Sequence, residues 1–305
     1  MYVFGPVPSR RLGISLGLDI IPYKTCNQDC LYCQLGRTTV KTNERRTYVS
    51  VSDLLNELKS VLSKNDSIDY ITFAGSGEPT LNSDLGKIIK KIKEISSIPV
   101  AVITNSLKMT DEDVRKELSA ADLIVPSLDS AVQDTFERLN RPCENIKIRD
   151  VIDSLVKFRQ NFSTTMWLEV MLIKGINNDK ENIENLRSAI EEIKPDEVQL
   201  NTAVRPSNSG EAKPLNMEEL QDIAGYLGRS CRVIASFDRK SNKVYNLNIE
   251  DEVLSLLKRR PCTLKEMSEV LSIHPNELSK YLGALEKDGK VKERVFNSEK
   301  FFQSC

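Results

Sequence analysis

The sequence predicts an α/β fold: a partial (β/α)6 TIM-like barrel followed by a small C-terminal winged helix-turn-helix domain. Two observations predict the barrel. Short apolar runs of strand length alternate with amphipathic helical segments, and the runs end in polar or glycine-containing stretches. Strands that alternate with helices of this length form a parallel sheet, and such barrels carry their chemistry at the C-terminal strand ends. A third observation, a charged stretch near residue 238, marks the second domain.

The composition is that of an ordinary globular protein. Hydrophobic residues make up 40% of the 305 residues and charged residues 29%, and a net charge of −1 gives no general attraction for nucleic acid or anionic membranes. Apolar runs fall short of the roughly 20 residues of a membrane span, and the N-terminus lacks a signal-peptide layout. We therefore expect a cytoplasmic protein without a membrane partner, whose thiols stay reduced.

The barrel elements follow one another in a regular order. Segment 5–13 is too rich in proline and glycine to predict regular structure, and Pro22 ends the first strand. Ser50 with Asp53 forms the N-terminal cap of the first helix. The predicted strands are 14–21, 68–73, 100–103, 123–126, 168–173, 197–201 and 232–235. The predicted helices are 51–62, 84–95, 111–118, 132–139, 146–158, 180–193 and 217–227.

The second domain is predicted at 249–305, after a barrel at 1–237 and a linker at 238–248. Thr263 and Glu266 form a capping box, and Pro275 lies in the first turn of the last helix. His274, the only histidine, is expected to begin that helix, so hydrolytic catalysis has no support. Three helices, 249–258, 264–271 and 275–286, and a hairpin of strands 290–295 and 300–303 predict a winged helix.

The charges of this domain argue against strong DNA binding. Residues 249–305 hold 10 Lys and Arg against 10 Asp and Glu. DNA-binding domains draw most of their affinity from a basic face that neutralises phosphates. We expect the winged helix to dock a peptide or protein substrate instead.

Three cysteines, Cys26, Cys30 and Cys33, follow the first strand at the spacing CxxxCxxC. Thiolates this close can hold one soft metal centre. Iron–sulfur clusters normally have four cysteine ligands, so three would leave one iron open. A structural zinc site and unrelated reduced thiols are the alternatives. The remaining cysteines have no second metal-binding spacing, which predicts a single cluster; they are Cys143, Cys231, Cys262 and Cys305.

The cysteine motif, with Tyr32 before its last cysteine, resembles the signature of radical S-adenosylmethionine (SAM) enzymes. The resemblance covers about residues 12 to 235. It implies a partial six-fold barrel, a [4Fe–4S] cluster on the three cysteines and SAM on the open iron. It also implies an electron donor such as ferredoxin or flavodoxin. Tyr32 would pack on the adenine of SAM.

The strand ends resemble the cofactor loops of this family. After the second strand, Gly75, Ser76, Gly77 and Glu78 look like the glycine-rich motif that approaches the methionine moiety, with Ser76 in place of one glycine. An ordinary turn with a helix-capping acid is the alternative. The other cofactor positions that the resemblance implies lie at the ends of the third to sixth strands: Asn105, Ser127, Asp129, Leu172 and Asn201.

These later positions have structural alternatives too. Asn105, Ser127 and Asp129 could bind the carboxylate and ribose hydroxyls of SAM, or could cap the following helices. Leu172 belongs to a segment like the one that contacts adenine, and it is also an ordinary core residue. Asn201 points to the cofactor or to substrate. Arg10 and Arg11 could hold an anionic group in the barrel mouth, although solvated arginines are common.

Within the family, segment 5–13 and the cysteine motif look like a little-characterised branch of iron–sulfur oxidoreductases related to the tRNA wyosine-base synthases. Archaeal wyosine synthases carry extra N-terminal cysteines for a second cluster, and this chain has no cysteine before Cys26. The substrate stays open, with a peptide or protein or an RNA base favoured. A second hypothesis is an iron–sulfur redox- or metal-sensing regulator that acts through the winged helix and does not consume SAM.

Overall fold

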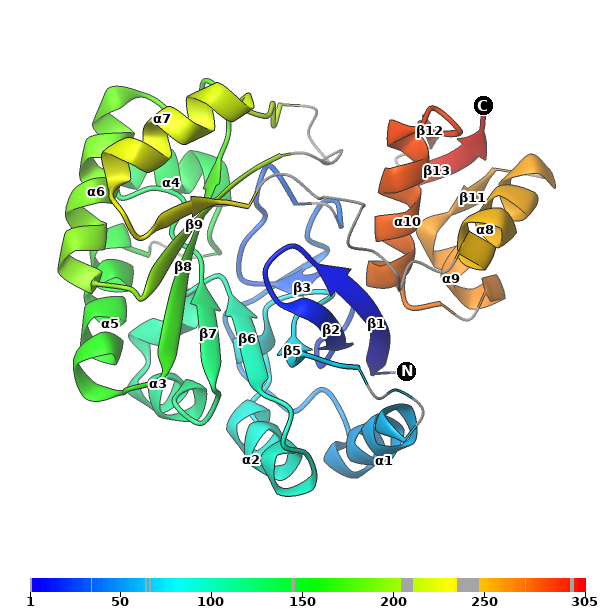
Figure 1. Cartoon of the computed structure of the whole chain (residues 1–305), viewed down its shortest axis with the longest axis horizontal. Coiled ribbons are helices and arrows are strands. Elements are labelled where there is room, and N and C mark those ends of the chain that lie inside the picture. Colours follow the sequence, from blue (N-terminus) through cyan, green and yellow to red (C-terminus); the bar gives the residue numbers. More distant parts are fainter. Residues whose placement is uncertain are drawn as a thin grey trace.

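The structure, a computed structural model, describes the chain except at residues 1, 34, 64, 66, 144–145, 204–210, 235–246, 260, 272 and 297–298. Most of the predicted linker, 238–246, and the turn of the predicted hairpin therefore lie outside the described residues. The described part shows an α/β fold with a largely parallel sheet, followed by a smaller unit of helices and strands (Figure 1). The predicted α/β class is confirmed.

One eight-stranded sheet organises the larger part of the molecule, in the order β1-β2-β5-β6-β7-β8-β9-β10. From β2 to β10 the neighbours pair in parallel, so the chain leaves these strands at one common edge. The strands are β1 (Val3–Ser9), β2 (Gly13–Leu18), β5 (Tyr70–Phe73), β6 (Val100–Thr104), β7 (Leu123–Pro126), β8 (Thr165–Leu172), β9 (Glu197–Thr202) and β10 (Cys231–Val233). All seven predicted strands are present.

The sheet curls so that strands far apart in its order approach each other. Arg10 and Arg11 follow β1 at one edge of the sheet, yet they hydrogen-bond to Glu169 on β8 and to Gln199 and Asn201 on β9. The strand ends of the whole sheet therefore surround one interior rather than forming a flat row.

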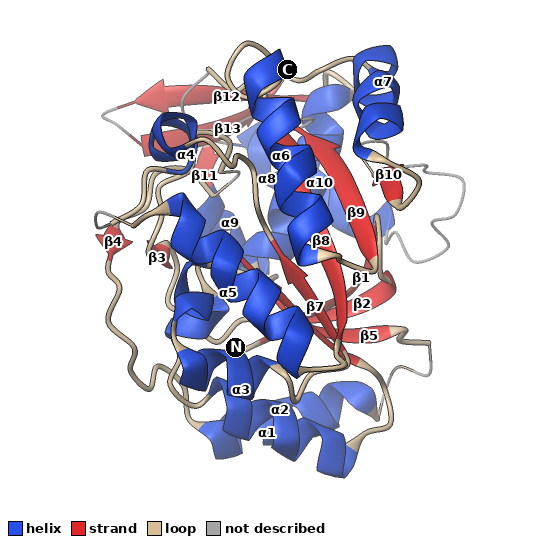
Figure 2. Ribbon diagram, turned by 90° about the vertical axis from the view of Figure 1, so that its left-hand side faces the viewer, coloured by secondary structure: helices blue, strands red, loops and turns tan. Residues whose placement is uncertain are grey.

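Helices cover the outer side of the sheet (Figures 1 and 2). They are α1 (Val51–Leu62), α2 (Leu85–Ile95), α3 (Glu112–Leu118), α4 (Gln133–Asn140), α5 (Ile148–Asn161), α6 (Lys180–Ile193) and α7 (Met217–Leu227). Their apolar stripes account for this packing: Leu85, Ile88 and Ile92 of α2 are fully buried against the sheet. The Ser50 side chain caps α1 as predicted, by accepting from the Asp53 amide. Short pieces complete the fold: β3 (Thr25–Cys26), β4 (Val40–Lys41), η1 (Pro79–Leu81) and η2 (Leu107–Thr110).

The opening segment corrects the sequence analysis. Residues 5–9, which we predicted to lack regular structure, belong to β1, which pairs antiparallel with β2. A register irregularity lies between Phe4 and Val7, in the proline-containing stretch. An edge strand needs ladder hydrogen bonds on one side only, so it tolerates prolines that an interior strand would not. Composition alone therefore misled the prediction.

The smaller unit has its own core. It contains α8 (Leu247–Arg259), β11 (Cys262–Thr263), α9 (Leu264–Leu271), α10 (Pro275–Lys287), β12 (Val291–Phe296) and β13 (Glu299–Ser304). Its sheet has the order β11-β13-β12, and its buried cluster includes Val253, Met267, Leu278 and Leu282. The predicted helices, the hairpin and the Thr263–Glu266 capping box are confirmed, whereas β11 was not predicted. Among the described residues, no helix is both long enough and apolar enough to cross a bilayer.

Candidate functional site

The cysteine loop lies at the edge where the parallel strands end. Cys26 is in β3, directly beyond β2, and its neighbour Thr25 forms a parallel bridge with Gly77 of the loop after β5. On the other side, the Leu31 amide donates to the Leu139 carbonyl at 2.9 Å, which ties the loop to the end of α4. The three cysteines therefore lie between the end of β5 and α4; all three are free, and each residue as a whole has intermediate exposure although its thiol is largely surrounded by protein.

Side-chain amides point at two of the three sulfur atoms. Asn105 Nδ2, after β6, lies 3.6 Å from Cys26 Sγ, and Asn140 Nδ2, the last residue of α4, lies 3.6 Å from Cys30 Sγ. The Gln28 amide also donates to Cys26 Sγ at 3.4 Å. Donors to ligating sulfurs tune the reduction potential of iron–sulfur centres. Asn105 was predicted, but Asn140 was missed because it lies 110 residues from Cys30 along the chain.

The electrostatics of the loop keep the thiols protonated. Burial raises the pKa of Cys26 to about 12, and the nearby Glu78 carboxylate adds to the rise. Burial also raises the pKa of Cys30, with the charge of Cys26 as the next cause, and it raises the pKa of Cys33. The charge of Cys33 adds to the rise in the pKa of both Cys26 and Cys30. Hydrogen bonds from Gln28 and Asn140 oppose the rise in the pKa of Cys26 and Cys30, and a bound metal would favour deprotonation further.

The donor set fits an iron–sulfur cluster. Amide donors lie against Cys26 and Cys30, and Asn27 Nδ2, next to Cys26 in the chain, is buried without a hydrogen-bond partner among the described residues. A buried donor of this kind suits an acceptor such as a sulfide or thiolate. In the described part of the chain, no three Cys, His, Asp or Glu side chains surround a single metal-ion position. Thiolates of a cluster bind different irons, so they need not converge on one point.

The glycine-rich loop packs directly on the cysteine loop. A Cβ on Gly77 would lie 1.7 Å from the Thr25 carbonyl oxygen, so only glycine permits this approach. The Ser76 carbonyl accepts from the Lys24 amide at 2.7 Å. Ser76 also donates its hydroxyl to the buried carboxylate of Asp19, which sequence reasoning missed. These contacts place the predicted residues Ser76 and Gly77 beside Lys24 and Thr25, at the start of the cysteine loop.

Glu78, the last residue of this loop, is buried and accepts hydrogen bonds from the segments that follow β5 and β6. Its carboxylate accepts from the Thr80 amide and hydroxyl at 3.1 and 2.6 Å, from the Thr104 hydroxyl at 2.7 Å and from the Asn105 amide at 2.8 Å. Burial raises the pKa of Glu78, and these hydrogen bonds oppose the rise. Glu78 thus joins the end of β5 to the end of β6 and orients Asn105.

Asp129, after β7, is the centre of a second buried cluster. Its carboxylate accepts from the Tyr32 hydroxyl, from Asn140 Nδ2 at 2.6 Å and from the Met171 amide at 2.9 Å. Burial raises the pKa of Asp129 to about 6, against the lowering effect of these hydrogen bonds. The tyrosine predicted to pack on adenine therefore has its hydroxyl fixed by another predicted residue. Ser127, Asp129, Asn105 and Asn140 line one small pocket.

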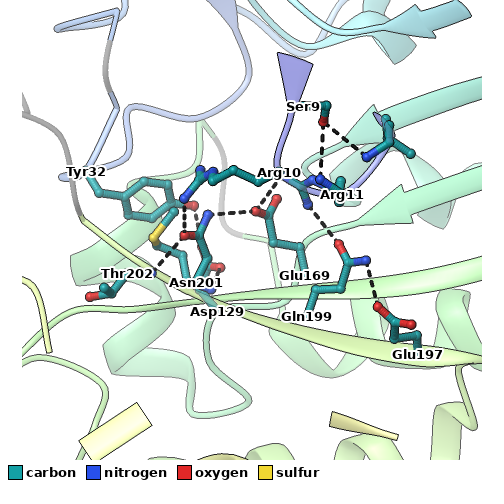
Figure 3. A network of polar contacts seen from close by, with 12 residues as sticks. Ser9, Arg10, Arg11, Tyr32, Asp129, Glu169, Glu197, Gln199, Asn201 and Thr202 are labelled. Carbon is teal, nitrogen blue, oxygen red and sulfur yellow. Dashed lines mark hydrogen bonds and ion pairs between the residues drawn. The ribbon is translucent and has the colours of Figure 1, made fainter. Parts of the chain in front are cut away.

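A polar network crosses the interior of the curled sheet (Figure 3). Arg11 contacts Glu169 on β8 at 2.8 Å, and Asn201 on β9 bridges Arg10 and Glu169 at 2.8 and 3.1 Å. The pKa of Glu169 is lowered: burial opposes the lowering, but the charge of Arg11 and the hydrogen bonds from Arg11 and Asn201 together outweigh it. The predicted Asn201 thus faces the arginines. The predicted Leu172 is fully buried beside this network, and its carbonyl accepts from Thr202.

The chain is similar to known proteins both in sequence and in structure. The model of the Radical SAM superfamily matches residues 20–186. A Brachyspira hyodysenteriae protein named GTPase Obg is 40% identical over 298 residues, which cover 97% of this chain but 44% of that protein. The chain thus spans less than half of that relative. A UPF0026 protein of Methanocaldococcus jannaschii is 33% identical over 303 residues, covering 94% of each.

Among solved structures, a radical SAM methyltransferase from Sphaerobacter thermophilus aligns with a TM-score of 0.58. The sequence identity is 15%, and the alignment covers 75% of this chain and 67% of that chain. At this identity the likeness concerns the fold alone. The range matched by the family model, residues 20–186, contains all three cysteines, the glycine-rich loop and Asp129.

Proposed function

The chain belongs to the Radical SAM superfamily, and from this premise we propose that it is an enzyme that cleaves SAM reductively and uses the resulting radical on a substrate. Members of the family bind a [4Fe–4S] cluster and SAM. When bound, the cluster supplies one electron that splits SAM into methionine and a 5′-deoxyadenosyl radical, which abstracts hydrogen from the substrate. The observation that carries the proposal is the placement of three thiols, with two amide donors, against the glycine-rich loop.

We assign different residues of this chain to the cluster and to the parts of SAM. Cys26, Cys30 and Cys33 would hold the cluster, with Asn105 and Asn140 donating to sulfur. The 75–78 backbone lies beside them and would receive the methionine end of SAM. The segment after β7 that carries Ser127 and Asp129 would lie beside the ribose, and the apolar segment at Leu172 beside the adenine. Burial among these loops would exclude water from the reacting atoms.

The substrate end of the site is the interior of the curled sheet, which we take to be the partial (β/α)6 barrel. The arginines after β1 and the amide of Asn201 provide donors there, with Glu169 as the buried counter-charge. Such a polar lining suits a peptide or an RNA base better than an apolar metabolite. The link to the wyosine-base synthases belongs to this proposal as well. An oxidoreductase or transferase outcome depends on the substrate.

The smaller unit and its partners complete the proposal. Its three helices and three-stranded sheet support assignment as a winged helix, which we infer docks a peptide or protein substrate. A ferredoxin or flavodoxin would supply the electron. The regulator hypothesis predicts a bound cluster without SAM turnover, so a turnover measurement separates the two functions.

The test is anaerobic reconstitution with iron and sulfide. We expect about four irons per chain and 5′-deoxyadenosine formation that depends on dithionite and SAM. Cys30→Ala removes a ligand and should abolish product, whereas Cys305→Ala, at an exposed thiol, is the matched control and should change nothing. Product formation by the Cys30→Ala chain, or a wild-type chain with a full cluster and no product, would refute the proposal.

A further inference from the structure

His274 lies buried between the smaller unit and the large sheet. It caps α10, since its Nδ1 accepts from the Asn276 amide at 3.2 Å. Its ring stacks on Phe4 of β1, with centroids 4.5 Å apart and planes 20° from parallel. Its Nε2 lies 3.0 Å from Asp19 Oδ2, and the side chains of both residues are at most 7% exposed. Because Nδ1 accepts, Nε2 carries the proton of the neutral ring and donates to Asp19.

Asp19 connects His274 to the glycine-rich loop through hydrogen bonds to both. Its Oδ2 also accepts from the Ser76 hydroxyl, and its Oδ1 accepts from the Ser76 amide at 3.2 Å. A Cβ on Gly75 would lie 2.6 Å from Asp19 Cγ and 3.0 Å from Asn276 Nδ2. The first turn of α10 and Asp19 therefore pack together against the loop at residues 75 and 76.

The same loop holds the start of the cysteine motif. Ser76 accepts from the Lys24 amide at 2.7 Å, two residues before Cys26, and Gly77 bridges to Thr25. The contacts thus run without a gap from α10 through Asp19 and Ser76 to the cysteine loop. The path from α10 to Lys24 consists of the side chains of His274, Asp19 and Ser76 and one backbone hydrogen bond.

We propose that His274 is a positioning residue for the SAM site: by donating to Asp19, it fixes the loop at residues 75–77, so that docking of the smaller unit and SAM binding favour each other. The proposal rests on the proposed function for the identity of the ligand. A buried carboxylate that must satisfy a hydroxyl, an amide and an imidazole has few alternative geometries. Loss of the imidazole donor leaves Asp19 free to rearrange, and Ser76 with it. Coupling of this kind is reciprocal between the two binding events.

Three variants separate positioning from simple docking. His274→Phe keeps the stack on Phe4 and removes the donor to Asp19. His274→Gln places an amide donor at nearly the reach of Nε2 and serves as the conservative rescue. Glu277→Ala is the matched control: it removes another contact between the same helix and β1, the hydrogen bond from the Gly5 amide at 3.2 Å, and leaves the hydrogen bonds of Asp19 and Ser76 in place.

The first readout needs no cofactor. Hydrogen–deuterium exchange of the full, metal-free chain follows the amides of residues 75–77. We expect faster exchange in His274→Phe, and wild-type exchange in His274→Gln and Glu277→Ala. Equal exchange in His274→Phe and wild type, or equally fast exchange in Glu277→Ala, would overturn the proposal.

The second readout is the SAM dependence of 5′-deoxyadenosine formation by the reconstituted enzyme. His274→Phe should raise the KM for SAM about tenfold with little change in kcat, the scale of one buried hydrogen bond to a charged group. Ser76→Ala should raise it as well, and the double variant should not exceed the larger single effect. Additive effects would overturn the proposal. Absence of product from the wild type would instead refute the proposed function, and the exchange readout would still decide the coupling.

Discussion

At the scale of single residues, the raised pKa values of the thiols in the cysteine loop predict slow reaction with alkylating reagents when no metal is bound. The pKa of Cys26 is raised to about 12 by burial and by Glu78, whereas Cys305 is exposed. At pH 8 a raised pKa means less thiolate, roughly a thousandfold less for Cys26 than for an ordinary cysteine. We predict that iodoacetamide alkylates Cys305 at least a hundredfold faster than Cys26 in the metal-free chain.

Peptide mass spectrometry at timed intervals measures this difference. Urea-unfolded chain is the control, because both thiols should then react at similar rates. Comparable rates in the folded chain would contradict the burial and pKa assigned to Cys26. Raising the pH towards 10 should speed labelling of Cys26, since more of the thiol is then ionised.

Residue contacts across long stretches of sequence were the hardest to predict. Gly75, Ser76 and Asp129 were predicted from their places after strands; in the structure Ser76 accepts from the Lys24 amide and Asp129 from the Tyr32 hydroxyl. Asn140 and Asp19 were missed, because nothing local distinguishes an asparagine that ends a helix or an aspartate after a strand. Their roles depend on partners 110 and 57 residues away.

At the scale of elements, helix ends were predicted best. The bounds predicted for α1, α6 and α7 coincide with those observed, since Ser50, Asp179 and Asn216 cap them through local hydrogen bonds. The strand β1 was missed because its pairing with β2 depends on a neighbour and not on composition. Local chemistry predicts helix ends, whereas an edge strand is defined by its partner.

The join between β5 and β6 yields an element-scale prediction. Glu78→Gln would turn an amide N–H towards one of the donors that the carboxylate now accepts from. We expect a loss of about 2 kcal/mol in the free energy of unfolding, the usual cost of an unsatisfied buried polar group. Urea denaturation followed by circular dichroism measures it. The control is Glu94→Gln at an exposed position, whose free energy of unfolding should stay within about 0.5 kcal/mol of wild type. An unchanged free energy of unfolding in Glu78→Gln would contradict the role of this carboxylate in joining β5 to β6.

At the scale of the whole molecule, charge decides which partners suit the protein. The net charge is −1, and the smaller unit carries equal numbers of acidic and basic residues. We predict no binding of random duplex DNA by the full chain at 150 mM salt and micromolar protein, because the balanced charges provide no net positive charge to neutralise phosphates. Fluorescence anisotropy measures this. Salt-dependent nanomolar affinity would contradict it and would favour the regulator hypothesis.

The contact between β1 and α10 also bears on how the protein is made. Gly5 and Glu277 meet across 272 residues of intervening chain. On the ribosome, the strand that carries Phe4 emerges long before the helix that covers it. The parallel strands can pair in their order of synthesis, but the buried environment of Asp19 cannot form until α10 has been synthesised. The contact that fixes the Ser76 side of the glycine-rich loop thus forms only after α10 has been made, and iron that arrives earlier would meet a loop without it.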